Sequence, residues 1–190
     1  MKRRSKRKVG NKENNMKNSL GTLLKSKCLC EIYTENNLST FCVGKIVCCD
    51  DVSLIAQCFN KYGEYDGYAI FYKDDIVKVA CDTEYLKCIA YFVGDSAVVE
   101  EFESKDLVLY TINTLIQNKS FAIISFCGEK ICGVIDSLQD NMISVTEYNE
   151  YGFCDGTSTL NLDNITCIEF DSKETKRVQA LADMKAKLPK

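Results

Sequence analysis

The second half of this 190-residue chain repeats the first half. Residues 44–82 align without a gap with residues 133–171 at a constant offset of 89, and eleven of the 39 aligned positions are identical. A repeat of this length in one register predicts two copies of one small domain. We therefore expect copy 1 at residues 15–93 and copy 2 at residues 94–190, after a separate segment at residues 1–14. The identical positions, numbered in copy 1, are Gly44, Ile46, Asp51, Asn60, Tyr62, Gly63, Asp66, Gly67, Asp74, Ile76 and Asp82.

Alternating apolar residues predict mainly β structure, with five short strands in each copy. In copy 2 the fourth strand passes through Leu160 and the fifth through Ile168. The alternation breaks between them, which predicts a tight corner at Asp163-Asn164 and an equivalent corner at Asp74-Asp75. The first three expected strands are residues 28–34, 42–50 and 53–60 in copy 1 and residues 121–126, 131–139 and 142–149 in copy 2.

Helical spacing predicts a helix at the start and at the end of each copy. Residues 16–25 form the first helix of copy 1, and a helix capped by Ser104 opens copy 2. Asp82 and Asp171 are expected to start the closing helices, with Glu174 as the capping-box partner of Asp171. Because the helix after Asp82 is very apolar, we expect it to be buried between the two copies.

Each copy carries the motif Asn-x-Tyr-Gly-x-x-Asp-Gly, at residues 60–67 and 149–156. The glycines and the Asp-Gly pair are typical of a turn between strands. A repeated turn is a candidate contact for a partner. The candidate residues are Tyr62, Gly63, Asp66, Gly67, Tyr151, Gly152, Asp155 and Gly156.

The carboxylates of this region also suit a hard cation such as calcium. They are Asp66 and Asp82 in copy 1 and Asp155 and Asp171 in copy 2. Turn and helix-capping roles explain a carboxylate at each of these positions without a cation. We therefore predict no metal site, and a cation would require each pair to converge on one point.

Charge is divided unevenly along the chain. Residues 1–12 carry seven Lys and Arg and no acid, and residues 173–190 carry six basic and two acidic residues. The remaining residues 13–172 hold 11 basic and 25 acidic side chains, a net charge of −14. A body this acidic repels phosphate backbones, so attraction to nucleic acid must come from the ends. Residues 1–14 are expected to be a disordered basic arm, either a solubilising tail or an electrostatic contact for an acidic partner.

The chain has twelve Cys and no His, and no C-x2-C pair typical of a zinc site. Between the copies Cys exchanges with apolar residues, since Cys42 aligns with Ile131 and Cys81 with Phe170. This exchange favours Cys as a small core residue. Without His, a phosphate-binding loop or a dinucleotide fingerprint, the sequence predicts neither an enzyme nor a cofactor.

Copy 2 combines a helix, five short strands, a glycine in the second strand and a sharp corner before the fifth. Gly128 with residues 133–145 looks like the first Sm signature, and residues 160–165 stand where the second falls. The pattern resembles the Sm-like fold, a strongly bent SH3-type barrel, and is similar to a group of bacterial Sm-like proteins. It covers both copies, residues 15–172.

The resemblance implies a mainly β chain of two tandem five-stranded Sm-like barrels with flanking α-helices. It also implies ring formation by pairing of strand edges, and RNA binding by two loops. The second of these loops carries Arg-Gly in the family but Asp74-Asp75 and Asp163-Asn164 here. Acid therefore replaces base where phosphate contacts would form.

We expect a non-catalytic interaction module that works through barrel edges and the repeated turns. Its partner is another protein or a second copy of the chain, and either the two barrels pair within the chain or several chains close a ring. No apolar run is long enough to span a membrane and no export signal is present, which favours a cytoplasmic location. The alternative is RNA binding through Lys2, Arg3, Arg4, Lys6, Arg7, Lys8, Tyr65, Tyr68, Tyr72 and Lys73.

Overall fold

A computed structural model of the chain describes residues 20–34, 37–93, 102 and 104–187. In this part of the chain the structure is mainly β, with ten antiparallel strands in one open sheet. No helix in the described residues is long and apolar enough to cross a membrane. The strands of the first half are β1 (Leu29–Thr34), β2 (Asn37–Cys49), β3 (Ser53–Phe59), β4 (Tyr65–Tyr72) and β5 (Ile76–Cys81). Those of the second half are β6 (Phe121–Phe126), β7 (Glu129–Gln139), β8 (Met142–Tyr148), β9 (Cys154–Asn161) and β10 (Ile165–Phe170).

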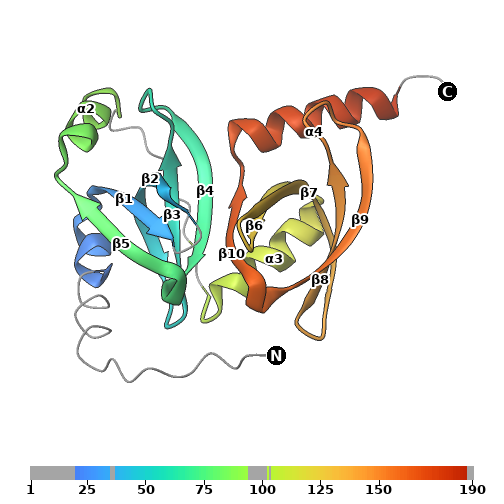
Figure 1. Cartoon of the computed structure of the whole chain (residues 1–190), viewed down its shortest axis with the longest axis horizontal. Coiled ribbons are helices and arrows are strands. Elements are labelled where there is room, and N and C mark those ends of the chain that lie inside the picture. Colours follow the sequence, from blue (N-terminus) through green and yellow to red (C-terminus); the bar gives the residue numbers. More distant parts are fainter. Residues whose placement is uncertain (1–19, 35–36, 94–101, 103, 188–190) are drawn as a thin grey trace.

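The strand order β5-β1-β2-β3-β4-β10-β6-β7-β8-β9 repeats one arrangement twice. In each half the fifth strand pairs with the first, and the fourth lies at the far side. Antiparallel pairing of β4 with β10, from Phe71 opposite Cys167 to Tyr68 opposite Phe170, joins the halves, and the two strands lie side by side at the centre of Figure 1. The outermost strands of the sheet are β5 and β9.

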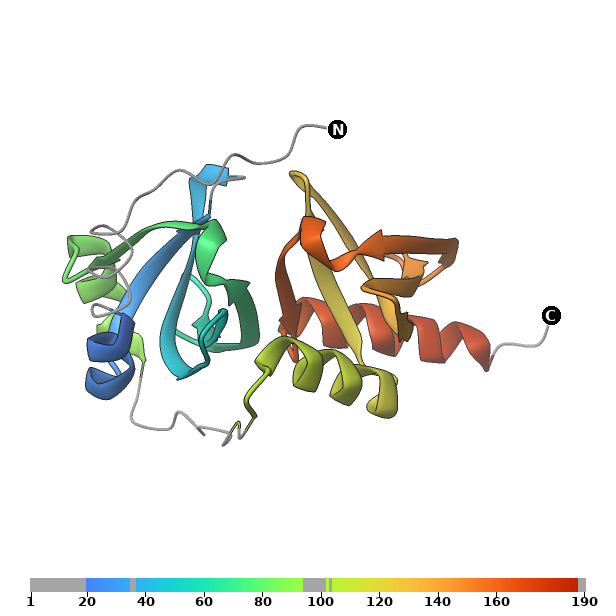
Figure 2. The ribbon, with the colours of Figure 1, turned by 90° about the horizontal axis from the view of Figure 1, so that it is seen from below.

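The helices with defined bounds in the described part of the chain are α2 (Glu84–Phe92), α3 (Leu107–Asn118) and α4 (Lys173–Ala186). Residues 20–26 are also helical. Helices α3 and α4 both flank the second half, as Figure 2 shows. Helix α3 precedes the first strand of the second half, as helical residues 20–26 precede the first strand of the first half.

The strands lie where the alternation of apolar residues predicted them. The second strand of each half is longer than expected, because β2 and β7 begin at Asn37 and Glu129 to continue the hairpins with β1 and β6. Both predicted corners are short 3-10 turns, η1 (Lys73–Asp75) and η2 (Leu162–Asn164). These corners let the fourth strand turn directly into the fifth.

The predicted helix caps were wrong by one or two residues. Asp106, not Ser104, caps α3, because its Oδ1 accepts the N–H of Leu109 at 3.0 Å. Thr83 and Ser172 cap α2 and α4. Each cap follows an aspartate in the left-handed region, Asp82 at φ 56° and Asp171 at φ 58°.

The predicted capping box of α4 was also wrong. Ser172 Oγ accepts the N–H of Thr175 at 3.1 Å, and the Thr175 hydroxyl donates back to the Ser172 carbonyl at 3.0 Å. Glu174 instead pairs with Arg177. Ser172, one residue after Asp171, is close enough to accept from the free N–H groups in the first turn of the helix. Asp171 has a left-handed backbone conformation and lies just before the helix, so it does not cap it.

The expectation that α2 is buried between the copies was wrong. Figure 1 shows α2 at the outer end of the first half, away from the junction of β4 with β10. Only Leu86 and Ile89 of this helix are buried, against Val43 and Phe59, while the Tyr91 side chain is 87% exposed. Its apolar residues are therefore divided between a small core and the surface.

The cores of the two halves share residues across the junction. Ile55, Tyr68 and Ile70 of the first half belong to the core cluster that fills the second half. In return Cys167 of β10 belongs to the cluster of the first half. The predicted role of Cys as a core residue holds for Cys30 and Cys167, which are buried in this cluster. The junction is thus packed as well as hydrogen-bonded.

Asp50 makes a second tie between the halves. Its Oδ2 accepts the N–H of Leu107, the first residue of α3, at 2.8 Å. Its Oδ1 accepts the N–H groups of Ser53 and Val52 at 2.6 Å and 2.8 Å. Partial burial opposes ionisation of this carboxyl, but the three N–H donors outweigh burial and hold the pKa of Asp50 below its usual 3.8.

We expect Asp50→Asn to lower the free energy of unfolding by about 1–2 kcal/mol at pH 7, because one of the two accepting oxygens becomes an amide nitrogen that cannot accept. At least one backbone N–H then loses its partner at this partly exposed site. A depressed pKa contributes stability that is present above the unfolded value and is lost as pH falls through the folded value. The difference between wild type and Asp50→Asn should therefore shrink below about pH 4 in urea unfolding curves. Asp51→Asn, at the exposed neighbour, is the control. A difference that stays constant with pH would contradict this role of Asp50.

Candidate interaction site

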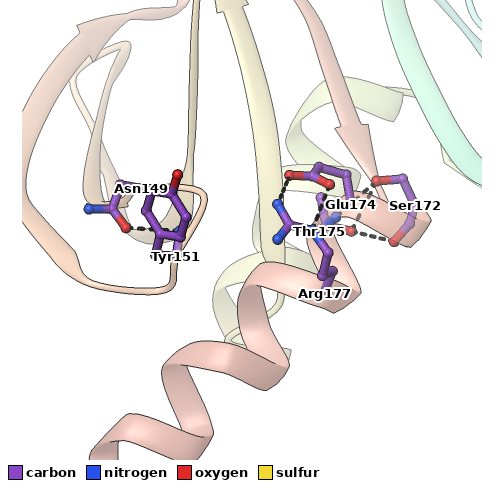
Figure 3. Close-up of polar contacts among 6 residues, drawn as sticks. All are labelled: Asn149, Tyr151, Ser172, Glu174, Thr175 and Arg177. Carbon is purple, nitrogen blue, oxygen red and sulfur yellow. Dashed lines mark hydrogen bonds and ion pairs between the residues drawn. The ribbon is translucent and has the colours of Figure 1, made fainter.

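The first part of the repeated motif is an Asn-stabilised turn in both halves. Asn60 Oδ1 accepts the N–H groups of Tyr62 and Glu64 at 2.9 Å and 3.2 Å. Asn149 Oδ1 accepts those of Tyr151 and Phe153 at 3.0 Å and 3.1 Å, and Figure 3 shows Asn149 beside Tyr151. An Asn side chain that imitates a backbone turn explains why this residue recurs at both sites.

The Tyr-Gly step holds each turn against the closing helix of its own half. Gly63 has φ +73°, and a Cβ there would lie 2.6 Å from Cβ of Phe92 in α2. Gly152 has φ +74°, and its Cβ would lie 2.6 Å from the backbone N of Ala182 in α4. Only glycine combines a positive φ with this close approach. The two glycines thus anchor helices and are not available to a partner.

The tyrosines of the motif stand on the surface beside these contacts. Tyr62 is 63% exposed and Tyr151 is 61% exposed. The carbonyl of Tyr151 accepts a hydrogen bond from Lys185 Nζ of α4 at 2.6 Å. The rings therefore remain open to a partner, while the backbone of the second turn is fixed to its helix.

The start of α4 is held firmly at the junction. Ser172 and Thr175 exchange the capping bonds described above, and Figure 3 shows them next to the ion pair of Glu174 with Arg177. Arg177 donates through Nε at 3.0 Å and through Nη2 at 2.7 Å to the two carboxylate oxygens of Glu174. This fork lowers the pKa of Glu174. The first turn of α4 is thus a rigid surface for residues of the first half.

The Asp-Gly step of the first motif binds that surface. Asp66 Oδ1 accepts the N–H of Lys173, the first residue of α4, at 2.9 Å. Gly67 has φ +81°, and a Cβ there would lie 2.3 Å from the carbonyl oxygen of Phe170 and 2.5 Å from the N of Ser172. Asp66 and Gly67 therefore belong to the junction between the halves.

Two further side-chain contacts fasten the same junction. The Tyr65 hydroxyl donates to Asp171 Oδ2 at 2.7 Å. Burial and this carboxylate raise the pKa of Tyr65, so the phenol remains a donor at all ordinary pH. Lys173 Nζ forms an ion pair with Glu64. Glu64 and Lys173 carried no signal in the sequence, because nothing relates two opposite charges that are so far apart in the chain.

The second Asp-Gly step has the same sequence and different surroundings. Asp155 and Gly156 lie on β9, the outermost strand of the second half, and both are exposed. A Cβ on Gly156 would meet nothing within 4 Å, and the Asp155 carboxylate has no partner among the described residues. The motif that joins the halves at β4 is thus exposed at the free edge.

The residues proposed for RNA contacts lie in several different places. Lys2, Arg3, Arg4, Lys6, Arg7 and Lys8 are outside the described residues. Tyr68 is only 3% exposed and its ring stacks on Phe170 at 5.7 Å between centroids, so it offers no face to a base. Burial raises the pKa of the half-buried Tyr72 to about 12. Lys73 Nζ donates to the carbonyl of Asp50.

Two of the four carboxylates considered for a cation, Asp66 and Asp171, serve local bonds. Asp66 accepts the Lys173 N–H, and Asp171 accepts from Tyr65 and pairs with Lys176 at 2.8 Å. In the described part of the chain no group of three or more Cys, Asp or Glu side chains is arranged to hold a metal ion. The geometry of this region therefore serves strand and helix contacts.

Comparison with protein-family models, with curated proteins and with solved structures returned no match to the chain. The site is therefore defined by its own geometry. It consists of the Asp-Gly steps of the two motifs, one closed in the junction and one open at β9.

We expect Gly67→Ala to lower the free energy of unfolding by about 3 kcal/mol or more, because the added Cβ overlaps the backbone of β10 and α4. Gly128→Ala is the matched control, since Gly128 has a similar φ of +85° but open space around it. In Gly128→Ala the free energy of unfolding should fall by only about 1–2 kcal/mol, because alanine is strained in the left-handed backbone conformation. Urea unfolding of both variants measures the difference, and equal losses would show that Gly67 matters only for its φ.

Proposed function

We propose that the protein is a non-catalytic cytoplasmic interaction module of two tandem Sm-like barrels, which self-associates by pairing β9 of one molecule with β5 of the next. The proposed barrels are supported by the repeated order of a helix, five strands and a 3-10 corner in each half. Self-association is supported by the internal junction, in which the same two kinds of strand already pair. Strand β4 corresponds to β9, and β10 corresponds to β5.

The observation that carries this proposal is the open Asp155-Gly156 step at the sheet edge. At the internal junction Gly67 allows close approach to β10, and Asp66 accepts an N–H at the start of α4. Gly156 has a positive φ of +120°, and a Cβ there would have no atom within 4 Å. Another strand can therefore approach its backbone as β10 approaches Gly67. An unpaired edge strand with this motif is a surface for another strand.

The opposite end of the sheet presents the matching surface. Asp82 and Thr83 follow β5 as Asp171 and Ser172 follow β10, with nearly equal φ angles of 56° and 58° at the two aspartates. Thr83 caps α2 as Ser172 caps α4. The backbone N–H of Glu84 is thus the counterpart of the Lys173 N–H, which Asp66 accepts within the chain. In the proposed assembly, the Asp155 carboxylate of one molecule accepts the Glu84 N–H of the next.

The internal register defines the register between molecules. Transfer of the β4–β10 pairs by the repeat offset places Cys81 opposite Thr157 and Val79 opposite Thr159. The outer side of β5 and the outer side of β9 are different surfaces, so association is head to tail. Head-to-tail contacts close into a ring when the rotation allows it and otherwise form a filament.

The contact between molecules is expected to be weaker than the internal one. The positions of Tyr65 and Glu64 hold Cys154 and Phe153 in the second half, and the position of Lys173 holds Glu84. The bond from Tyr65 to Asp171 and the ion pair of Glu64 with Lys173 are therefore missing between molecules. Backbone pairing and the Asp155 acceptor remain, which predicts assembly that depends on protein concentration.

RNA binding has less support than self-association. Of the aromatic residues proposed for it, Tyr68 is buried and Tyr65 is bonded within the junction. The basic residues at positions 2–8 keep that role as an expectation from charge.

We expect sedimentation equilibrium of the full chain to show masses that are multiples of 21.4 kDa and rise with protein concentration. Thr157→Lys with Thr159→Lys should shift the protein to a monomer, because lysines on an edge strand oppose pairing. Ser137→Lys with Gln139→Lys adds the same charge at exposed positions of the internal strand β7 and should leave the assembly intact. A wild-type chain that stays monomeric at every concentration would contradict the proposal.

The register can be tested separately by cross-linking. Thr157→Cys places a thiol opposite Cys81 of a neighbouring molecule, whereas Ser158→Cys places it opposite Ala80. We expect mild oxidation to form a disulfide between residue 157 and Cys81 of a neighbouring molecule in Thr157→Cys. In Ser158→Cys the new thiol should form no disulfide with Cys81. Links from both positions would show association in another register.

A further inference from the structure

A cleft crosses the sheet beside the junction and has thiols in its wall. Its volume is about 650 Å³, and it is lined by residues of β1, β2, β3, β4, β6, β7, β10 and α2. Cys42 of β2, Cys58 of β3 and Cys167 of β10 all contribute to its lining. Cys42 and Cys58 are half-buried, whereas Cys167 is buried. The cleft therefore offers a path from solution to the first two cysteines.

Cys42 and Cys58 form a close pair on neighbouring strands. Their Sγ atoms are 3.1 Å apart, in hydrogen-bond contact. In the pairing of β2 with β3, Gly44 lies opposite Cys58. Cys42 is two residues before Gly44 in β2, so its side chain is on the same face of the sheet as that of Cys58. The sulfurs need to approach by only about 1 Å to reach the S–S bond length of about 2.05 Å.

We propose that Cys42 and Cys58 are a redox-active dithiol that low-molecular-weight disulfides convert to an intramolecular disulfide. The thiolate of one cysteine attacks the small disulfide, forms a mixed disulfide and releases one small thiolate. The thiolate of the second cysteine then attacks the protein sulfur of the mixed disulfide and releases the second small thiolate. The protein loses two electrons and two protons, and the small disulfide is reduced to two thiols.

The surroundings of the pair assign the two roles. The hydrogen bond with Cys42, burial and nearby Cys167 and Glu169 raise the pKa of Cys58 well above its usual value. Cys58 therefore stays protonated at neutral pH, and the first attack is assigned to Cys42. Lys130 lies in the lining of the cleft with Glu169, which it pairs at 2.7 Å.

Other thiols of the chain are less suited to this chemistry. Cys30 and Cys81 are opposite each other in the pairing of β1 with β5, but Cys30 is fully buried and donates to the carbonyl of Gly44. Cys167 shares the cleft but is buried in the core of the first half. Cys81 is also hydrogen-bonded to Cys28, and both are half-buried, but neither lines the cleft. Cys42 and Cys58 combine contact between sulfurs with a place in the cleft wall.

The test is oxidation of the full wild-type chain with glutathione disulfide over a series of glutathione ratios. Free thiols are then alkylated and the protein is digested with trypsin without reduction. We expect the peptide of residues 28–45 to be linked to the peptide of residues 46–61, two hydrogen atoms lighter than their sum, with fragmentation placing the bond between Cys42 and Cys58. Reduction should reverse the link. Alkylation of both cysteines at every ratio, or separate glutathione adducts on each, would overturn the proposal.

Variants separate this pair from its neighbours. Cys42→Ser and Cys58→Ser should each abolish the link, and Cys167→Ser, in the same cleft, should retain it. Oxidation of wild type should also raise the midpoint of thermal unfolding by several degrees, because the bond closes a loop in the unfolded chain. The rise should disappear with dithiothreitol and in Cys42→Ser. A link that persists in Cys42→Ser would assign the chemistry to other thiols.

Discussion

The pairing of β4 with β10 is the interaction on which the rest of the molecule depends. Without it each half is a five-stranded sheet with two open edges and a small core, which is a marginal size for an independent fold. The pairing removes one edge from each half and lets Tyr68 and Cys167 cross into the neighbouring cores. Asp50 adds a bond from the first half to the start of α3. A single strand contact therefore organises the sheet, the packing and the orientation of the helices.

The two halves have diverged at the surfaces that decide pairing. Both keep the Asp-Gly step after the Asn turn, and both keep an aspartate in the left-handed region before the closing helix. Only the internal junction adds the Tyr65 bond to Asp171 and the charge pair at Lys173. These additions favour the pairing within the chain over the pairing of β9 of one molecule with β5 of another. The outer edges keep the backbone geometry without the side-chain bonds, which suits reversible assembly better than a permanent one.

Local rules recovered much of the fold. The repeat and the alternation of apolar residues placed the strands and both corners, since each depends on neighbours in sequence. The caps were missed because Ser172 and Thr83 stand next to aspartates that also suit a cap, and only the backbone turn decides between them. The place of α2 was missed because apolar content alone does not say which surface receives it. The motif was recognised as a turn, but its division into a helix anchor at Gly63 and a junction contact at Gly67 depends on tertiary neighbours.

The positions of the cysteines were also predicted only in part, because some depend on neighbours in sequence and others on tertiary contacts. Exchange with apolar residues predicted core positions, which Cys30 and Cys167 occupy. Cys42 aligns with Ile131 and Cys58 with Glu147, so the close pair has no counterpart in copy 2. A thiol that replaces a glutamate is not explained by the need for an apolar filler. Its contact with Cys42 supplies a reason, because the two sulfurs meet across neighbouring strands in the wall of the cleft. The first half thus carries a thiol pair at the cleft, and the second half carries the open Asp-Gly edge.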